Sequence, residues 1–367
     1  MSDSIINNMS DFIVKLVQKF LSKDNKSCFI SAGFENYAIS QGRTLNMVGN
    51  NTYGQIGNGT RRNSKVPVPI SLPSTIIWVA SGQCFTVAIT KDGKVYSWGT
   101  HVKTICFRPI NSSVKEGTGD NLIPILVKKI KSRRAIKVSA STWNYIVLFD
   151  DGSVFIKVQK RKEGFMFSLD HKIVDVAINS RAYLITENGS LFEADMGSGI
   201  LMRKETETLD ITTRQIKLPG KEKVVKISTG GQFLTILSDS GKVYTYSVSS
   251  VWTTDDGKEH PNANTSECYP GKYGPGGSFL EKRDPPSFED LGGPISTISS
   301  NYDTAMAVSK DGELYIWCPE VVISTAIDIP TGRIIKDIYA GYNFAILLLD
   351  NNDVYYWGNE RFPKLKF

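Results

Sequence analysis

A segment that recurs along the whole chain is the feature that most restricts its fold. Residues 79–99 read VASGQCFTVAITKDGKVYSWG: a short β-branched run, an Asp-Gly turn and a second strand that ends at Trp98 and Gly99. Asp-Gly suits a tight hairpin turn, because glycine readily adopts the positive φ that such turns need. The segment therefore predicts a β-hairpin, and its recurrence predicts a repeat protein.

Seven copies of this segment share one register. They begin at Ile30, Val79, Val138, Val176, Ile227, Ile298 and Ile338. Their hairpin turns carry Gly42, Gly93, Gly152, Gly189, Gly241, Gly312 and Asn352. The spacing of the copies is typical of propeller blades rather than of helical solenoids. Seven small sheets around one axis bury one another's faces, so the pattern predicts an all-β fold, a seven-bladed β-propeller.

One further motif carries a family resemblance. The run VGNNTYGQIGNGT at residues 48–60, with DGKVY and SWG in the next copy, resembles the RCC1 (regulator of chromosome condensation) repeat family, whose repeats typically carry WGxNxxGQLGxG. Known members form seven-bladed propellers, so the resemblance implies that fold for residues 28–367. Side chains would clash within so compact a turn, which explains its glycines. The turn residues expected to be structural here are Gly54, Gln55, Gly57 and Gly59.

The two ends of the chain have distinct expected roles. Residues 1–27 contain a predicted amphipathic helix at 11–22 and a linker, and residues 28–367 form a single propeller domain. We expect the helix to dock on its own domain; the alternatives are a partner or a membrane surface. Residues 360–367 resemble the apolar strands near proline that precede most copies. We therefore expect this C-terminal strand to join the first sheet and close the ring.

Composition excludes several classes of site. The 367 residues carry a formal net charge of +6, and 41% of them are hydrophobic. Five isolated cysteines argue against a disulfide framework or a zinc site. The three histidines have no ligand-spaced neighbours, and no phosphate-binding loop or nucleophile elbow is present. We expect no catalytic residue, metal or cofactor. Without a secretory or membrane-spanning segment, the expected location is intracellular, cytoplasmic or nuclear, rather than secreted.

Departures from the repeat are the candidate recognition regions, because loops on a rigid scaffold commonly carry binding residues. They lie at residues 101–131, 159–171 and 249–294. The first two border a candidate basic patch, which could bind phosphate or an acidic protein surface. Its residues are Lys128, Lys129, Lys131, Arg133, Arg134, Lys137, Lys160, Arg161 and Lys162. The third holds a candidate recognition loop with Tyr269, Lys272, Tyr273, Phe279, Lys282 and Arg283.

Three functions follow from these features. The first is a non-catalytic protein-interaction scaffold, which we expect to be a monomer that binds a protein partner. The second is implied by the resemblance alone: guanine-nucleotide exchange on a Ran-like small GTPase, which the founding member of the family performs with a β-hairpin wedge. The third is binding of DNA or chromatin through the basic patch. The sequence does not place an equivalent wedge.

Overall fold

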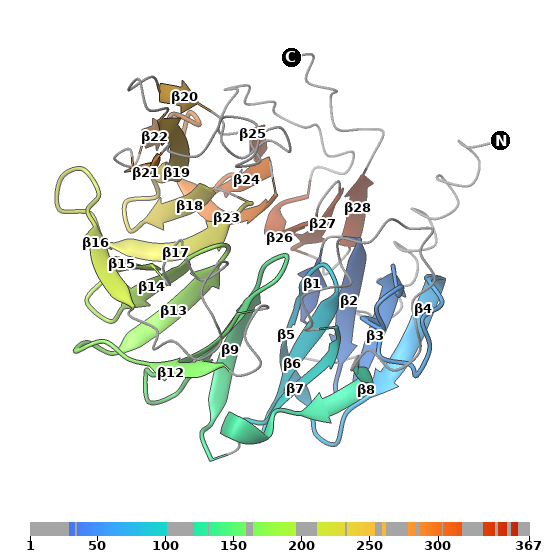
Figure 1. Ribbon diagram of the computed structural model, residues 1–367. Coiled ribbons are helices and arrows are strands. Elements are labelled where there is room, and N and C mark those ends of the chain that lie inside the picture. Colours follow the sequence, from blue (N-terminus) through green and yellow to red (C-terminus); the bar gives the residue numbers. More distant parts are fainter. Residues whose placement is uncertain are drawn as a thin grey trace.

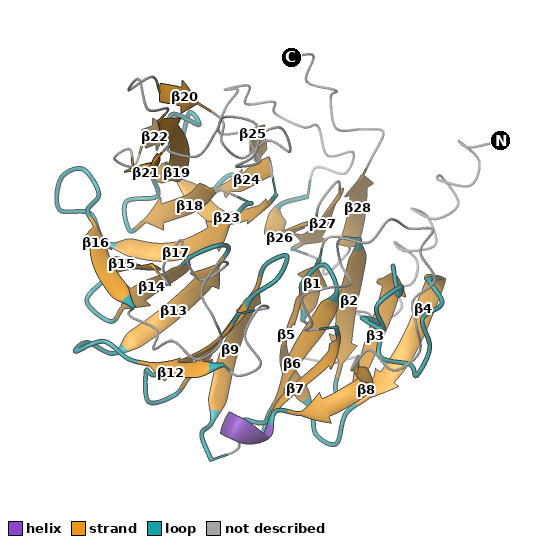
Figure 2. Ribbon diagram, viewed as in Figure 1, coloured by secondary structure: helices purple, strands orange, loops and turns teal. Residues whose placement is uncertain are grey.

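The computed structural model describes most of the chain between Phe29 and Gly358. The described residues are 29–33, 35–100, 121–130, 132–158, 164–195, 211–231, 233–253, 259–261, 278–283, 287–302, 304–317, 333–341, 344–350 and 354–358. They form β-strands and one short 3₁₀ turn, η1 (Lys128–Ile130), drawn in purple in Figure 2. Within this part of the chain, no helix has the length and apolar character needed to cross a membrane. The predicted N-terminal helix and C-terminal strand lie outside the described residues.

The strands form seven antiparallel sheets, each built from one continuous stretch of chain. The first two sheets contain β1 (Ile30–Ala32), β2 (Asn36–Gln41), β3 (Thr44–Gly49) and β4 (Ser64–Ser71), then β5 (Ile76–Ser81), β6 (Phe85–Thr90), β7 (Val95–Gly99) and β8 (Asn121–Leu126). The next two contain β9 (Ala135–Ala140), β10 (Tyr145–Phe149), β11 (Val154–Lys157) and β12 (Phe165–Phe167), then β13 (Ile173–Ile178), β14 (Ala182–Thr186), β15 (Leu191–Asp195) and β16 (Thr212–Ile216).

The remaining three sheets are less uniform. The fifth contains β17 (Val224–Thr229), β18 (Phe233–Ser238), β19 (Val243–Thr253), β20 (Glu259–Pro261), β21 (Ser278–Arg283) and β22 (Ser287–Glu289). The sixth contains β23 (Ile295–Asn301), β24 (Thr304–Ser309) and β25 (Leu314–Trp317), and the seventh β26 (Ile335–Ala340), β27 (Phe344–Leu349) and β28 (Val354–Gly358). All seven repeat copies begin in the first strand of a sheet, so the predicted seven-bladed β-propeller is confirmed.

The blades close into a ring around the first strand of each sheet. These inner strands contact one another in chain order, and β26 contacts β1, which completes the circle. In Figure 1 the blue β1 and β2 accordingly lie beside the red strands of the last blade. Seven apolar clusters fill the seven blade interfaces, and the closing one joins Ile30, Tyr37 and Ile39 to Phe344 and Ile346. Burial of apolar surface between blades, rather than within them, therefore holds the ring together.

The inner strands are also linked by side chains. Neighbouring inner strands belong to different sheets, so their amides need other partners. The hydroxyls of Ser31, Ser228 and Ser299 accept bonds from amides in the next blade, at 2.8–3.3 Å. Short serine side chains near the axis thus satisfy backbone groups that no sheet ladder reaches.

Each glycine turn touches the blade that follows it. The carbonyl of Gly93 accepts a 3.0 Å bond from the amide of Ala135, at the start of the next inner strand. Gly93 has a φ of 78°, and a Cβ there would lie 2.8 Å from the Cα of Arg134. The turn therefore needs glycine both for its backbone conformation and for the close approach of the next blade.

This close approach predicts unequal effects of alanine at two turns. Gly42 has a φ of 59°, but a Cβ added there would meet no atom within 4 Å. We expect Gly42→Ala to lower the free energy of unfolding by about 1–2 kcal/mol through backbone strain alone. Gly93→Ala should cost about 2–4 kcal/mol, because overpacking adds to the strain. Urea unfolding of both variants measures the difference; equal losses would contradict the packing role of Gly93.

The third departure from the repeat is not simply a loop. Strand β19 continues through Thr253, and β20 and β21 pair with its distal half. Strand β22 pairs with its proximal half and completes the fifth blade. The sequence missed this ribbon because residues 249–294 combine strand segments with glycine- and proline-rich stretches, and the latter dominate the composition.

Candidate interaction surface

The described residues of the predicted basic patch have different surroundings. Arg133 is exposed and forms an ion pair with Asp151. Lys137 lies on β9 toward the axis of the ring, pairs with Asp175 and stands 5.2 Å from the centre of the Trp78 ring. Lys128 is exposed, the backbone of Lys129 lies in η1, and Arg134 covers the turn glycine of the preceding blade. Lys131, Lys160, Arg161 and Lys162 lie outside the described residues.

The predicted recognition loop is only partly described. Its described members lie on β21 and face β19 in register, with Phe279 opposite Trp252, Lys282 opposite Ser249 and Arg283 opposite Val248. Tyr269, Lys272 and Tyr273 lie outside the described residues. The backbone thus presents part of this segment as an edge of the ribbon on the fifth blade.

The glycine-rich turn after β3 joins the first two blades. Gln55 is fully buried, and its carbonyl accepts bonds of 2.8 Å from both Trp98 Nε1 and Thr86 Oγ1. A Cβ on Gly57 would lie 2.6 Å from Trp98 Nε1, and one on Gly54 would lie 2.5 Å from the side chain of Leu122. The polar groups of this turn are occupied by internal bonds, which leaves it an architectural element.

The other predicted turn glycines have similar positions. Gly59 has positive φ and its amide bonds to the carbonyl of Leu122. The hairpin glycines with positive φ are Gly93, Gly152, Gly189, Gly241 and Gly312. Together with the starts of the inner strands, these hairpin turns form one face of the ring, which we call the turn face.

Charged side chains near the axis pair with one another. Besides the Lys137–Asp175 pair, Lys226 Nζ lies 2.6 Å from Thr297 Oγ1 and 3.6 Å from Asp337 Oδ1. These groups come from the third position of successive inner strands. Because opposite charges meet between blades, the axis offers little unbalanced charge to a ligand.

Three exposed aliphatic side chains lie at equivalent positions on the turn face of blades three to five. Ile136, Val174 and Val225 are 37%, 45% and 52% exposed. Each lies at a β-bulge near the start of its inner strand, where the ladder skips one residue. The bulge pushes the side chain out of the alternation that buries its neighbours. We call these three residues the aliphatic row.

The row distinguishes blades three to five from the rest of the ring. The equivalent bulge positions carry Ile77, which is partly buried, Ser296 and Lys336. Sequence reasoning missed the row, although the residue two positions before the copies at Val138, Val176 and Ile227 is aliphatic in all three. Only the observation of a bulge shows that these residues face outward.

A cavity of about 470 Å³ opens beside the row, between blades four and five. Its lining includes Val174 and Val225, together with Glu187, Lys223 and Asp239. The nearby Lys242 adds no unpaired positive charge to the cavity, because its Nζ forms an ion pair with Glu222 Oε1 at 2.7 Å. Partial burial alone would raise the pKa of Glu222, but hydrogen bonds from Lys242, Ser238 and Tyr244 lower it to about 2. This pair is therefore firmly ionised and engaged.

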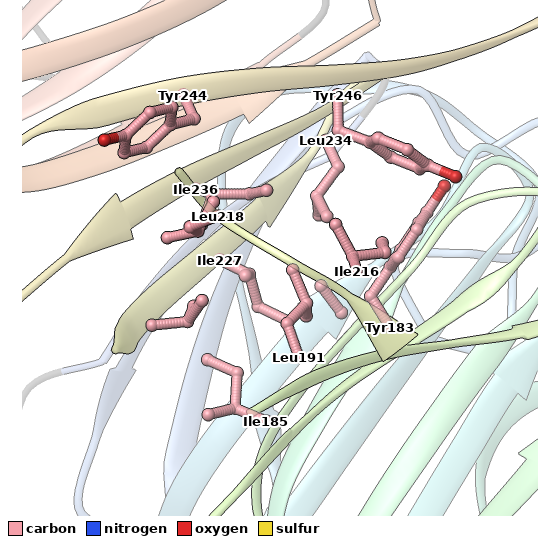
Figure 3. Packing of buried hydrophobic residues seen from close by; sticks show 12 residues of the cluster. Tyr183, Ile185, Leu191, Ile216, Leu218, Ile227, Leu234, Ile236, Tyr244 and Tyr246 are labelled. Carbon is pink, nitrogen blue, oxygen red and sulfur yellow. The ribbon is translucent and has the colours of Figure 1, made fainter. Parts of the chain in front are cut away.

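A buried charged group lies in the same blade interface. The carboxylate of Glu193, 1% exposed, lies 2.7 Å from Arg181 Nε and accepts a 2.8 Å bond from the Tyr246 hydroxyl. Figure 3 shows the hydroxyls of Tyr183 and Tyr246 directed toward each other above the apolar cluster. Burial raises the pKa of Tyr183, and the nearby negative charge of Glu193 raises it further. Each member contacts its neighbours, so the group is structural.

The described residues hold no group of three or more His, Cys, Asp or Glu side chains placed to bind a metal. Cys84, the free cysteine of this part of the chain, is buried. The titratable groups with shifted pKa values lie in turns or between blades rather than converging on one cleft.

Comparison with known proteins agrees with the fold. Family models of the Regulator of chromosome condensation (RCC1) repeat match residues 47–89 and 335–362. The Ultraviolet-B receptor UVR8 of Arabidopsis thaliana is 21% identical over 360 residues, which cover 94% of this chain and 65% of the receptor. The human Regulator of chromosome condensation is 22% identical, over 80% of this chain and 83% of that protein. This chain thus spans less than two thirds of the length of UVR8.

A solved structure extends the likeness to three dimensions. Prp20p from Saccharomyces cerevisiae, whose structure was described with its binding to Gsp1p and histones, superposes with a TM-score of 0.64 at 16% identity. The superposition covers 93% of this chain and 84% of Prp20p. The chain thus carries RCC1 repeat matches toward both ends of the ring, and its seven-bladed β-propeller resembles the fold of RCC1 repeat proteins.

Proposed function

We propose that the protein is a non-catalytic protein-interaction scaffold whose partner binds the turn face of blades three to five. The aliphatic row carries this proposal. Three neighbouring aliphatic side chains held outward by bulges gain free energy when a partner removes them from water. The rigid ring holds them in fixed positions, so little free energy is lost in ordering them when a partner binds.

The test is affinity capture with the row altered. Val174→Glu with Val225→Glu places two charges in the row without touching the buried neighbours. Partners retained by the wild type should be lost from this variant and kept by Val66→Glu, which alters an equally exposed valine on β4. Identical partner sets for all three proteins would refute the proposal. Circular dichroism of each variant verifies that the propeller is folded.

A second candidate is guanine-nucleotide exchange on a Ran-like small GTPase, favoured by the likeness to Prp20p, which was studied for its binding to Gsp1p. Release of a fluorescent guanine nucleotide from a panel of GTPases measures it directly. Acceleration by the full chain would support exchange, and unchanged release across the panel would oppose it. Binding of DNA through the basic patch, and an intracellular location in cytoplasm or nucleus, are further proposals.

A further inference from the structure

We propose that the cavity between blades four and five binds a polypeptide segment that presents an aliphatic side chain next to a lysine or arginine. This inference rests on the proposed scaffold function and specifies the chemistry of the partner. It follows from the walls of the cavity, which combine exposed aliphatic surface with an excess of carboxylates.

The aliphatic part of the site is Val174 and Val225, which lie on adjacent inner strands. Ile173 and Val176 occupy the core positions around Val174, so this valine cannot withdraw into the interior. Val224 and Ile227 restrict Val225 in the same way. An aliphatic side chain of the partner would bury surface that the fold itself leaves exposed.

The charged part of the site has a net negative balance. The cavity lining contains Lys137 and Lys223 against Asp175, Glu187 and Asp239. Lys137 and Asp175 neutralise each other. Of the remaining three, the stem of Lys223 covers Gly189, and one Asp239 oxygen accepts the Lys223 amide at 3.2 Å.

Glu187 and Asp239 have no cationic side chain bound to them among the described residues. Two carboxylates thus share the cavity with one lysine whose stem is held over a neighbouring turn. A cation on the partner would restore the balance, whereas a second anion would be repelled.

The extent of the aliphatic row favours a polypeptide over a small ligand. Ile136 continues the row onto blade three, beyond the cavity. A bound segment that fills the cavity with one side chain can extend across the turn face toward Ile136. The cavity volume of about 470 Å³ lies within the general range of ligand pockets.

The test uses four fluorescein-labelled octapeptide pools and the full chain. Each pool fixes two central residues, Leu-Lys, Leu-Glu, Ser-Lys or Ser-Glu, and randomises the others. Fluorescence anisotropy should rank the Leu-Lys pool first, about tenfold tighter than the others. Val225→Ser should weaken that pool about tenfold. Glu187→Gln with Asp239→Asn should reduce its advantage over the Leu-Glu pool several-fold.

Matched controls occupy equivalent places elsewhere. Asp350→Asn alters the turn position on blade seven that is equivalent to Asp239. The amide of Asp350 bonds to the carbonyl of Ile334, just before the inner strand, as the amide of Asp239 bonds to that of Lys223. Val66→Ser alters an exposed valine on β4. Neither should change binding. Equal binding of the Leu-Glu pool, lost in Val225→Ser, would overturn this inference while supporting the scaffold function. Absence of any binding above the Ser-Glu pool would overturn the inference, and the capture experiment would judge the scaffold separately.

Discussion

Replacing Trp98 with alanine is expected to lower the free energy of unfolding by about 3–5 kcal/mol. The side chain is fully buried in the cluster between blades one and two, and its Nε1 donates a 2.8 Å bond to the carbonyl of Gln55. Its ring lies directly against Gly57. Because glycine has no side chain, this neighbour cannot fill the space that truncation of Trp98 would leave. Alanine would remove apolar contacts and create a cavity between two rigid sheets.

Urea unfolding followed by far-ultraviolet circular dichroism measures this loss. Trp98→Phe is the control, because it keeps most of the apolar volume and removes only the bond to Gln55. We expect it to cost about 1–2 kcal/mol. A loss below about 1 kcal/mol for Trp98→Ala would mean that the interface relaxes around the missing ring.

The second large effect concerns the buried pair of Arg181 and Glu193. Arg181→Met should lower the free energy of unfolding by about 3–5 kcal/mol, because it leaves the Glu193 carboxylate buried without its cation. The Tyr246 hydroxyl remains bonded to that carboxylate, but a neutral donor cannot offset the lost charge. Glu193→Leu should be similarly destabilising, since it removes the carboxylate that lies 2.7 Å from Arg181 Nε in the same interface.

A double-mutant cycle tests the coupling. Arg181→Met combined with Glu193→Leu should be more stable than the sum of the two single losses, by about 2 kcal/mol or more. Strictly additive losses would show that the two charges act independently. Tyr183→Phe serves as a nearby control in the same cluster, since it changes a hydroxyl without removing either charge.

The repeat pattern was sufficient to predict the seven-bladed propeller. The signal was strong because each copy combines strand alternation with a glycine turn, and only a ring of such sheets buries their faces. Residues 249–294 escaped prediction, since the long β19 continues past the usual end of a third strand. Pairing with β21, some 30 residues away, is a tertiary event that local composition does not reveal.

The candidate surface was harder to predict than the fold. Lys137 belonged to a run of basic residues in sequence, yet it meets Asp175 on the next blade and becomes part of the axis. A count of charges along the chain does not show that β9 runs from the turn near Arg133 toward the axis, where Lys137 lies. Conversely, Val174 and Val225 read as ordinary core residues of apolar strands, and only the bulges reveal that they face solvent.

The closing seam between blades seven and one has a consequence for how the ring opens. Six interfaces join blades that follow one another in the chain, but the seventh joins opposite ends, as in the apolar cluster that packs Ile30 and Ile39 against Phe344 and Ile346. Contacts between residues so far apart in sequence stabilise the fold only after the entropy of closing the intervening chain has been lost. The seam therefore forms last, and its amides should be the first of the inner strands to exchange with solvent.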